Sequence, residues 1–147
     1  MLRAYKINIK KGHKLYNYFD EICIKSKNLY NTTNFFIRQA LTGSIKDEKD
    51  LTPNEKYVLD LINNNIDKAN QIKIKKSSKK GEEVKLFKSI DKDNRLLSYT
   101  LLDAIFKITK NKDYYALPSH SNQGIMKQAF DDWSGFFASM KSFKTSS

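Results

Sequence analysis

The sequence from Tyr114 to Lys141, YYALPSHSNQGIMKQAFDDWSGFFASMK, decides how the chain is organised. Within it, apolar side chains recur at alternating intervals of four and three residues, at Met126, Phe130, Trp133, Phe137 and Met140. That spacing places them on one face of an α-helix. Because an apolar helix face has to pack against other apolar surface, the pattern predicts a final helix that packs on a helical body.

Hydrogen-bonding residues fill the predicted first turn of this helix, at Ser119, His120, Ser121, Asn122 and Gln123. A helix start needs one capping side chain rather than five. Polar side chains on the first turn of a firmly packed helix are how many proteins reach base edges in a DNA groove. The turn therefore favours nucleic-acid recognition, with all of these residues except Ser121 as candidates near bases. For Gln123, an ordinary helix-surface position remains the alternative.

The charge of the chain agrees with this prediction. Lysine and arginine number 27 against 16 aspartates and glutamates, which gives a net charge of +11. Such an excess suits nucleic acid or an anionic membrane surface. Nearly all of the cations are lysines, which suit phosphate backbones better than base edges. The candidate phosphate contacts are Lys127, Lys10, Lys11 and Lys14. Codon usage that favours lysine in a soluble protein is the alternative.

Length and residue types exclude several classes of protein. A chain of 147 residues that is 39% hydrophobic forms one domain with a modest core. No apolar run is long enough to span a membrane or to act as a signal peptide, so we expect a cytoplasmic location. One cysteine and two distant histidines argue against a disulfide and a metal site. Without a phosphate-binding loop or a catalytic constellation, we expect neither a cofactor nor enzymatic activity from this chain alone.

The sequence predicts a mainly α fold with a single N-terminal β-strand. Residues 3–10 alternate apolar and polar side chains, as a half-buried strand does. A long amphipathic helix follows and ends at Gly43, with a possible break at the weak helix formers of residues 31–34. About four helices are expected in all. Because one strand has nothing to pair with, its partners are expected elsewhere.

The middle of the chain holds the clearest start signal for a helix. Thr52, Pro53 and Glu55 combine an N-cap, a proline at the first position and a capping-box glutamate. Residues 71–92 are rich in lysine and lose the helical pattern, so we expect a basic mobile loop there. Ser98 is expected to cap a short helix with an apolar face, before Pro118 introduces the last helix.

Several segments together resemble the N-terminal part of the TnpB (OrfB) family of transposon-encoded RNA-guided DNA endonucleases, which are related to type V CRISPR effectors. The matching stretches are RAYKI from Arg3, SKNLYN from Ser26, LSY with LLD from Leu97, and ALPS from Ala116 through to Phe137. No single motif is specific, but their order and spacing cover essentially the whole chain.

The resemblance implies a particular domain organisation. Residues 1–12 would be the first strand of a wedge-type barrel, and residues 13–147 a helical recognition domain inserted into it. In that family a RuvC-like nuclease with three metal-binding acids and a zinc ribbon follow on the C-terminal side. The sequence stops at Ser147, before both, so the resemblance implies a truncated copy, a fragment of a longer protein or a derivative that lacks the nuclease. Divalent metal and zinc are then expected only in the absent part, and no catalytic residue is carried over.

The resemblance also assigns candidate site residues and partners. Tyr99 and Gln123 match positions that face a short DNA motif beside the target, and Ser119 and His120 lie at neighbouring positions. Gly124 departs from the family, in which a larger polar residue is common. The implied partners are DNA with a target-adjacent motif and a guide RNA, with no membrane. A glutamine amide can pair with adenine, and a tyrosine ring can stack on a base, which agrees with both assignments. For Tyr99, a half-buried structural aromatic is the alternative.

Two other functions remain open from the sequence. The first is a free-standing regulator that lacks a nuclease and binds the guide RNA or the DNA motif without cutting. The second is a helical structural adaptor that uses the aromatic stripe of the last helix to bind a protein partner.

Overall fold

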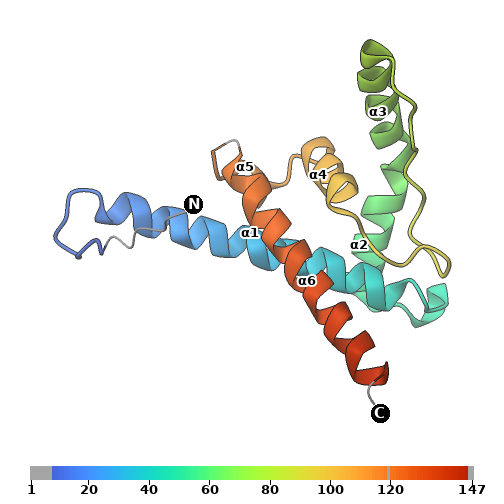
Figure 1. The fold of residues 1–147 in the computed structure, drawn as a ribbon, viewed down its shortest axis with the longest axis horizontal. Coiled ribbons are helices and arrows are strands. Elements are labelled where there is room, and N and C mark those ends of the chain that lie inside the picture. Colours follow the sequence, from blue (N-terminus) through green and yellow to red (C-terminus); the bar gives the residue numbers. More distant parts are fainter. Residues whose placement is uncertain (1–7, 119, 146–147) are drawn as a thin grey trace.

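The chain is mainly helical, as the sequence predicts. A computed structural model describes residues 8–118 and 120–145. Its elements, in chain order, are α1 (Tyr16–Gly43), the 3-10 helix η1 (Glu48–Asp50), α2 (Pro53–Asn64), α3 (Ile66–Lys80), α4 (Tyr99–Ile108), α5 (Lys112–Tyr115) and α6 (Ser121–Thr145) (Figure 1). Most of the predicted strand over residues 3–10 lies outside the described residues. The described residues of that segment, 8–10, form no strand.

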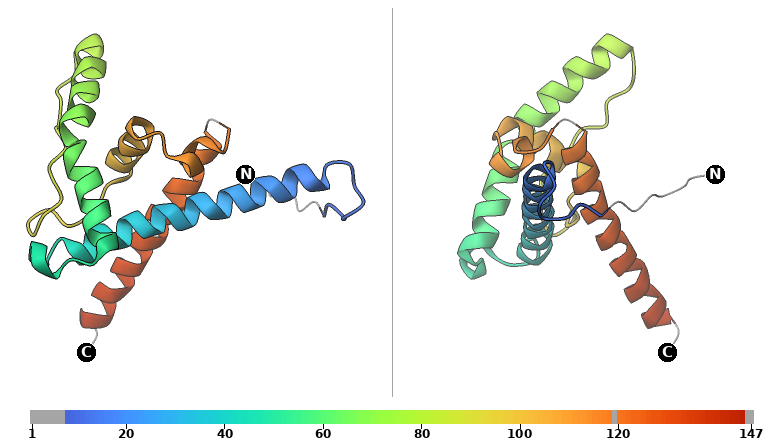
Figure 2. Two further views of the ribbon diagram at one scale, coloured as in Figure 1. Left: turned by 180° about the vertical axis from the view of Figure 1, so that it is seen from behind. Right: turned by 90° about the vertical axis from the view of Figure 1, so that its left-hand side faces the viewer.

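Helix α1, the longest helix in the described part of the chain, is central to the packing. It packs against α2, α5 and α6, while α4 packs against α3 and α6. Helices α2 and α3 rise from the C-terminal end of α1, and α6 crosses α1 and extends beyond it (Figures 1 and 2). The long side of the molecule is therefore one helix, with the other elements gathered on its C-terminal half.

The predicted break within α1 does not occur, because its polar residues bind other parts of the protein. Thr33 is fully buried in the core, and its hydroxyl donates to the Leu29 carbonyl one turn earlier in the same helix at 2.8 Å. Thr32 donates to Asp113 at 2.6 Å, and Asn34 accepts a hydrogen bond from Trp133. Low helix propensity is a weak preference that such tertiary contacts override.

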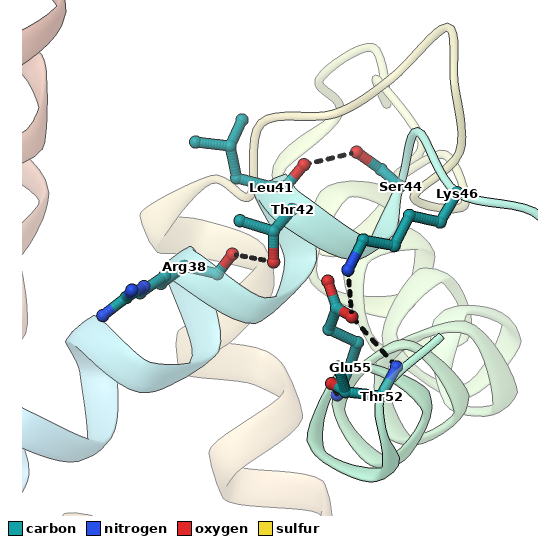
Figure 3. Close-up of polar contacts among 7 residues, drawn as sticks. All are labelled: Arg38, Leu41, Thr42, Ser44, Lys46, Thr52 and Glu55. Carbon is teal, nitrogen blue, oxygen red and sulfur yellow. Dashed lines mark hydrogen bonds and ion pairs between the residues drawn. The ribbon is translucent and has the colours of Figure 1, made fainter. Parts of the chain in front are cut away.

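The capping box predicted at the start of α2 is confirmed, and it also fastens α2 to the end of α1 (Figure 3). The Glu55 carboxylate accepts from the Thr52 backbone N–H at 3.0 Å and from Lys46 at 2.8 Å. Its side chain is almost fully buried. The Lys46 bond, followed by the Thr52 backbone bond, lowers the pKa of Glu55 to about 2. Glu55 is therefore an ionised anchor between the two helices.

Gly43 allows α1 and α2 to approach each other closely. A Cβ atom at this position would lie 2.9 Å from Cδ1 of Leu59 and 3.1 Å from Cβ of Glu55. Real Cβ atoms hardly ever come so near to another carbon. The predicted end of the helix at Gly43 is confirmed, and the glycine also permits this close packing.

The loop predicted over residues 71–92 is partly wrong, because α3 continues to Lys80. The chain then returns alongside the α2–α3 arm (Figure 1). Two asparagine side chains hold the returning segment. Each amide binds both the backbone N–H and the carbonyl of one residue, Asn70 those of Phe87 and Asn63 those of Ile90, at 2.7–3.2 Å. The two asparagines are seven residues apart on the helical arm, and their partners are three residues apart on the extended segment. Both separations correspond to about 10 Å, so both pairs of hydrogen bonds can form together.

The core lies where α1, α2, α4 and the beginning of α6 meet. Phe36 and Phe106 pack edge to face at its centre, with ring centroids 5.1 Å apart. The predicted apolar face of α4 is buried there, which confirms that part of the prediction. The largest fully buried apolar side chains are Phe106, Leu29, Ile62, Leu102, Ile105, Met126 and Val58.

The apolar stripe of α6 is buried at one end only. Met126 is fully buried, and Phe130 and Trp133 pack partly against the core. Beyond them, Met140 is 42% exposed. Among the described residues, no helix is long and apolar enough to cross a membrane.

Candidate functional site

Tyr99 lies at the junction of α4 and α6, where two of the predicted site segments meet. Ser98 caps α4 by accepting from the Leu101 backbone N–H at 3.3 Å, which fixes Tyr99 as the first helical residue. The half-buried Tyr99 ring packs edge to face on Phe130, with centroids 6.2 Å apart. The exposed Lys127 ammonium lies 5.2 Å from the centre of the same ring. Tyr99 and Lys127, 28 positions apart in sequence, thus form one surface.

A buried tyrosine supports this surface from below. The Tyr114 hydroxyl donates to Asp103 at 2.8 Å, and Lys107 binds the other Asp103 oxygen at 3.0 Å. Burial, and then the Asp103 bond, raises the pKa of Tyr114 far above its usual range, whereas a hydrogen bond from Gln123 lowers it. Burial also raises the pKa of Tyr99. Both phenols therefore stay neutral and keep their hydrogens at physiological pH.

Gln123 belongs to this cluster, since its half-buried side chain lies near the Tyr114 hydroxyl and lowers its pKa. Tyr114 already donates to Asp103, so the phenol remains satisfied if Gln123 turns to another partner. The structure thus brings Tyr99, Lys127 and Gln123 to neighbouring positions on α4 and α6. It gives Gln123 an internal partner that the sequence did not suggest.

Asn122 has a structural position. It is 6% exposed, and its amide donates to the Tyr114 carbonyl at 3.0 Å. Its side-chain oxygen accepts from the Gln123 backbone N–H at 2.7 Å. Because both ends of the amide are used and the side chain is buried, Asn122 attaches the start of α6 to α5 and is poorly placed to reach a base.

His120 remains a surface residue just before α6. It is exposed, its backbone has a left-handed φ of 74°, and its carbonyl accepts from the Gly124 N–H at 3.1 Å. Histidine tolerates this conformation better than most side chains do. Ser119, the other motif-facing candidate, lies outside the described residues.

The three N-terminal lysines lie apart from this surface. Lys10, Lys11 and Lys14 are exposed in the segment that leads into α1. That segment is at the opposite end of α1 from α2, well away from α4 (Figures 1 and 2). The structure therefore does not join them to Tyr99 and Gln123 in one site, and a shared ligand would have to extend along α1.

Sequence reasoning missed a second feature, an open groove between α1 and α6. Its polar walls are joined by two hydrogen bonds between the helices. Trp133 donates through Nε1 to Asn34 at 2.9 Å, and the Tyr30 hydroxyl donates to Asp132. The sequence signal that could have revealed the groove is the helical spacing of Tyr30 and Asn34 on α1. Their partners, however, lie about a hundred positions away in sequence.

No metal centre accompanies these features. Within residues 8–118 and 120–145, no three His, Cys, Asp or Glu side chains gather closely enough to hold a metal ion. Cys23 is exposed on α1.

Comparisons with known proteins add no relative. No family model matches this chain, and no characterised protein and no solved structure is significantly similar to it.

Proposed function

We propose that this chain is a nucleic-acid-binding recognition domain of the TnpB-like kind, which binds DNA at a short motif together with a guide RNA and does not cut by itself. The observation that carries the proposal is the meeting of Tyr99 with Lys127 and Gln123 at the α4–α6 junction. These residues come from the two segments that the sequence resemblance assigns to motif recognition.

The chemistry of this junction suits a nucleic acid. Lys127 is an exposed ammonium that lies over the Tyr99 ring, a weak interaction that leaves it able to bind a phosphate. The neutral Tyr99 hydroxyl can donate to a phosphate or a base. Gln123 offers the amide that pairs with adenine, once it exchanges Tyr114 for the base. The net charge of +11 supplies long-range attraction.

The affinity of the chain for duplex DNA and for RNA, measured over a range of salt concentrations, tests the proposal. We expect the logarithm of the association constant to fall linearly with the logarithm of salt concentration. Lys127→Gln should reduce the slope by about one unit, because one phosphate contact is lost. Lys49→Gln, in the exposed η1, is the matched control and should leave the slope unchanged.

A helical adaptor is the second candidate, favoured by the apolar side chains that α6 exposes. Phe136 is 53% and Met140 42% exposed, on the part of α6 that extends beyond the core. Large exposed apolar side chains on one helix are typical of protein interfaces. If the salt titration finds no affinity for DNA or RNA, the recognition-domain proposal is wrong and the adaptor becomes the better account.

A further inference from the structure

The groove between α1 and α6 is a second place where a ligand fits. It has a volume of 580 Å³ and is open to solvent, with Phe35, Arg38 and Gln39 on the α1 side and Trp133 and Phe136 on the α6 side. It lies farther along α6 than Lys127 and Phe130, which face Tyr99. The groove is therefore separate from the α4–α6 junction.

Hydrogen bonds between the helices fix the shape of this groove. Trp133 is held by Asn34, so the orientation of its indole ring is set from across the groove. Asp132 accepts from the Tyr30 hydroxyl and, at 2.9 Å, from Gln128. The Tyr30 bond, followed by the Gln128 bond, lowers the pKa of Asp132, so this carboxylate is ionised at neutral pH.

Other lining groups are left for a ligand. Among the described residues, the side chains of Asn31, Arg38 and Gln39 have no hydrogen-bond or ion-pair partner. Phe136 is 53% exposed and packs edge to face on Trp133, with centroids 5.9 Å apart. The groove thus combines an aromatic platform, two amides and an uncompensated guanidinium.

We propose that this groove holds one unpaired nucleotide of a single-stranded nucleic acid, with its base stacked on the exposed Phe136 ring beside Trp133 and its phosphate at Arg38. Aromatic platforms beside a cation are the usual means of binding single strands, because every base has a face that stacks. The inference rests on the proposed function, since it adds a second contact to the same class of partner.

The charges along the groove give the nucleotide a direction. Tyr30, which holds Asp132, and Arg38 are eight residues apart on α1, or about 12 Å along the helix. A carboxylate accepts from the exocyclic amine of a base, whereas a guanidinium binds phosphate. The base edge therefore lies toward Asp132 and the phosphate toward Arg38.

Trp133 is the only tryptophan in the chain, so its fluorescence reports directly on the groove. We expect saturable quenching when a short single-stranded ribo- or deoxyribo-oligonucleotide is added, and the sugar type that binds more tightly identifies the source. An abasic oligonucleotide of equal length should quench little. Phe136→Ala should weaken the quenching interaction by about tenfold, within the range measured for loss of one stacking partner. Arg38→Gln should weaken it and reduce its salt dependence.

Tyr57→Ala is the matched control, since Tyr57 is 57% exposed on α2 and does not line the groove. It should leave quenching unchanged, and urea unfolding of each variant checks that the fold is retained. Equal quenching by abasic and base-bearing strands, or equal loss in Phe136→Ala and Tyr57→Ala, would overturn the inference. If duplex DNA still binds but no strand perturbs Trp133, the groove inference alone fails. If no nucleic acid binds at all, the proposed function fails with it.

Discussion

The two halves of α6 have the same apolar period but different surroundings. In the inner half, residues 121–131, the side chains of Asn122, Met126 and Ala129 are buried against the rest of the fold. In the outer half, residues 132–145, no described residue is buried, and Phe136 and Met140 are largely exposed. The outer half extends away from the other helices (Figure 2). Periodicity therefore identifies an apolar face but does not say whether the chain itself covers it.

The polar side chains at the start of the inner half are turned toward the protein, whereas several polar side chains beside the outer half have no partner among the described residues. The inner half begins with amides turned toward the protein, since Asn122 donates to the Tyr114 carbonyl and Gln123 lies near the Tyr114 hydroxyl. The outer half borders a groove in which Asn31 and Arg38 of α1 have no partner among the described residues. A polar turn in a sequence can thus serve packing, while polar side chains without partners lie at a helix crossing that no local pattern marks.

Two methionines on α6 give the largest contrast. Met126→Ala should cost about 2–5 kcal/mol of unfolding free energy, because a fully buried side chain leaves a cavity. Met140→Ala, at the exposed end of the same stripe, should change it by less than about 0.5 kcal/mol. Urea unfolding measures both. Similar losses of unfolding free energy would mean that the outer half is also packed in solution, and would contradict the difference between the two halves.

Acid should weaken the junction of α1 and α2. Because the folded-state pKa of Glu55 is about 2, below its ordinary value of 4.5, its contribution is complete above about pH 4.5. That contribution is lost as the pH falls from about 4.5 to about 2. Glu55→Gln should be less stable than the wild type at neutral pH, and the difference should shrink in acid. A difference that stays constant with pH would contradict an ionised anchor.

A pair of asparagines gives a smaller contrast. Asn122→Ala should cost about 1–3 kcal/mol, since it leaves the Tyr114 carbonyl without its amide donor. Asn31→Ala, in the groove, should change the unfolding free energy by less than about 0.5 kcal/mol because its side chain is exposed. Thermal unfolding of the two variants side by side measures the difference. A costly Asn31→Ala would show that the groove amides hold the fold rather than await a ligand.

Local signals in the sequence predicted local structure well. The capping box at Thr52, Ser98 as the cap of α4 and the apolar face of α4 are all confirmed, because each depends on residues within a few positions. The predictions failed where distant residues decide. Asn34 strengthens α1 through Trp133, and Asn70 holds Phe87 beside α3, and neither pairing is visible in a local pattern.

The residues of the candidate site were predicted only in part, because some of their contacts involve residues distant in sequence. Tyr99, Gln123 and Lys127 were singled out, and the structure brings them to one junction. The position of Gln123 near Tyr114 was not foreseen, because α5, which holds Tyr114, was not predicted. The groove was missed altogether, since its walls come from α1 and α6, about a hundred residues apart.

Selection of bound sequences from a pool of randomised duplex DNA, by the wild type and by Gln123→Ala, shows whether Gln123 reads a DNA motif. Gln71→Ala, an exposed glutamine on α3, is the matched control. We predict that the wild type and Gln71→Ala enrich the same short motif, whereas Gln123→Ala binds DNA with similar overall affinity but loses discrimination at one position, by about 1–3 kcal/mol. Unchanged discrimination in Gln123→Ala, or no motif enriched by the wild type, would contradict the account.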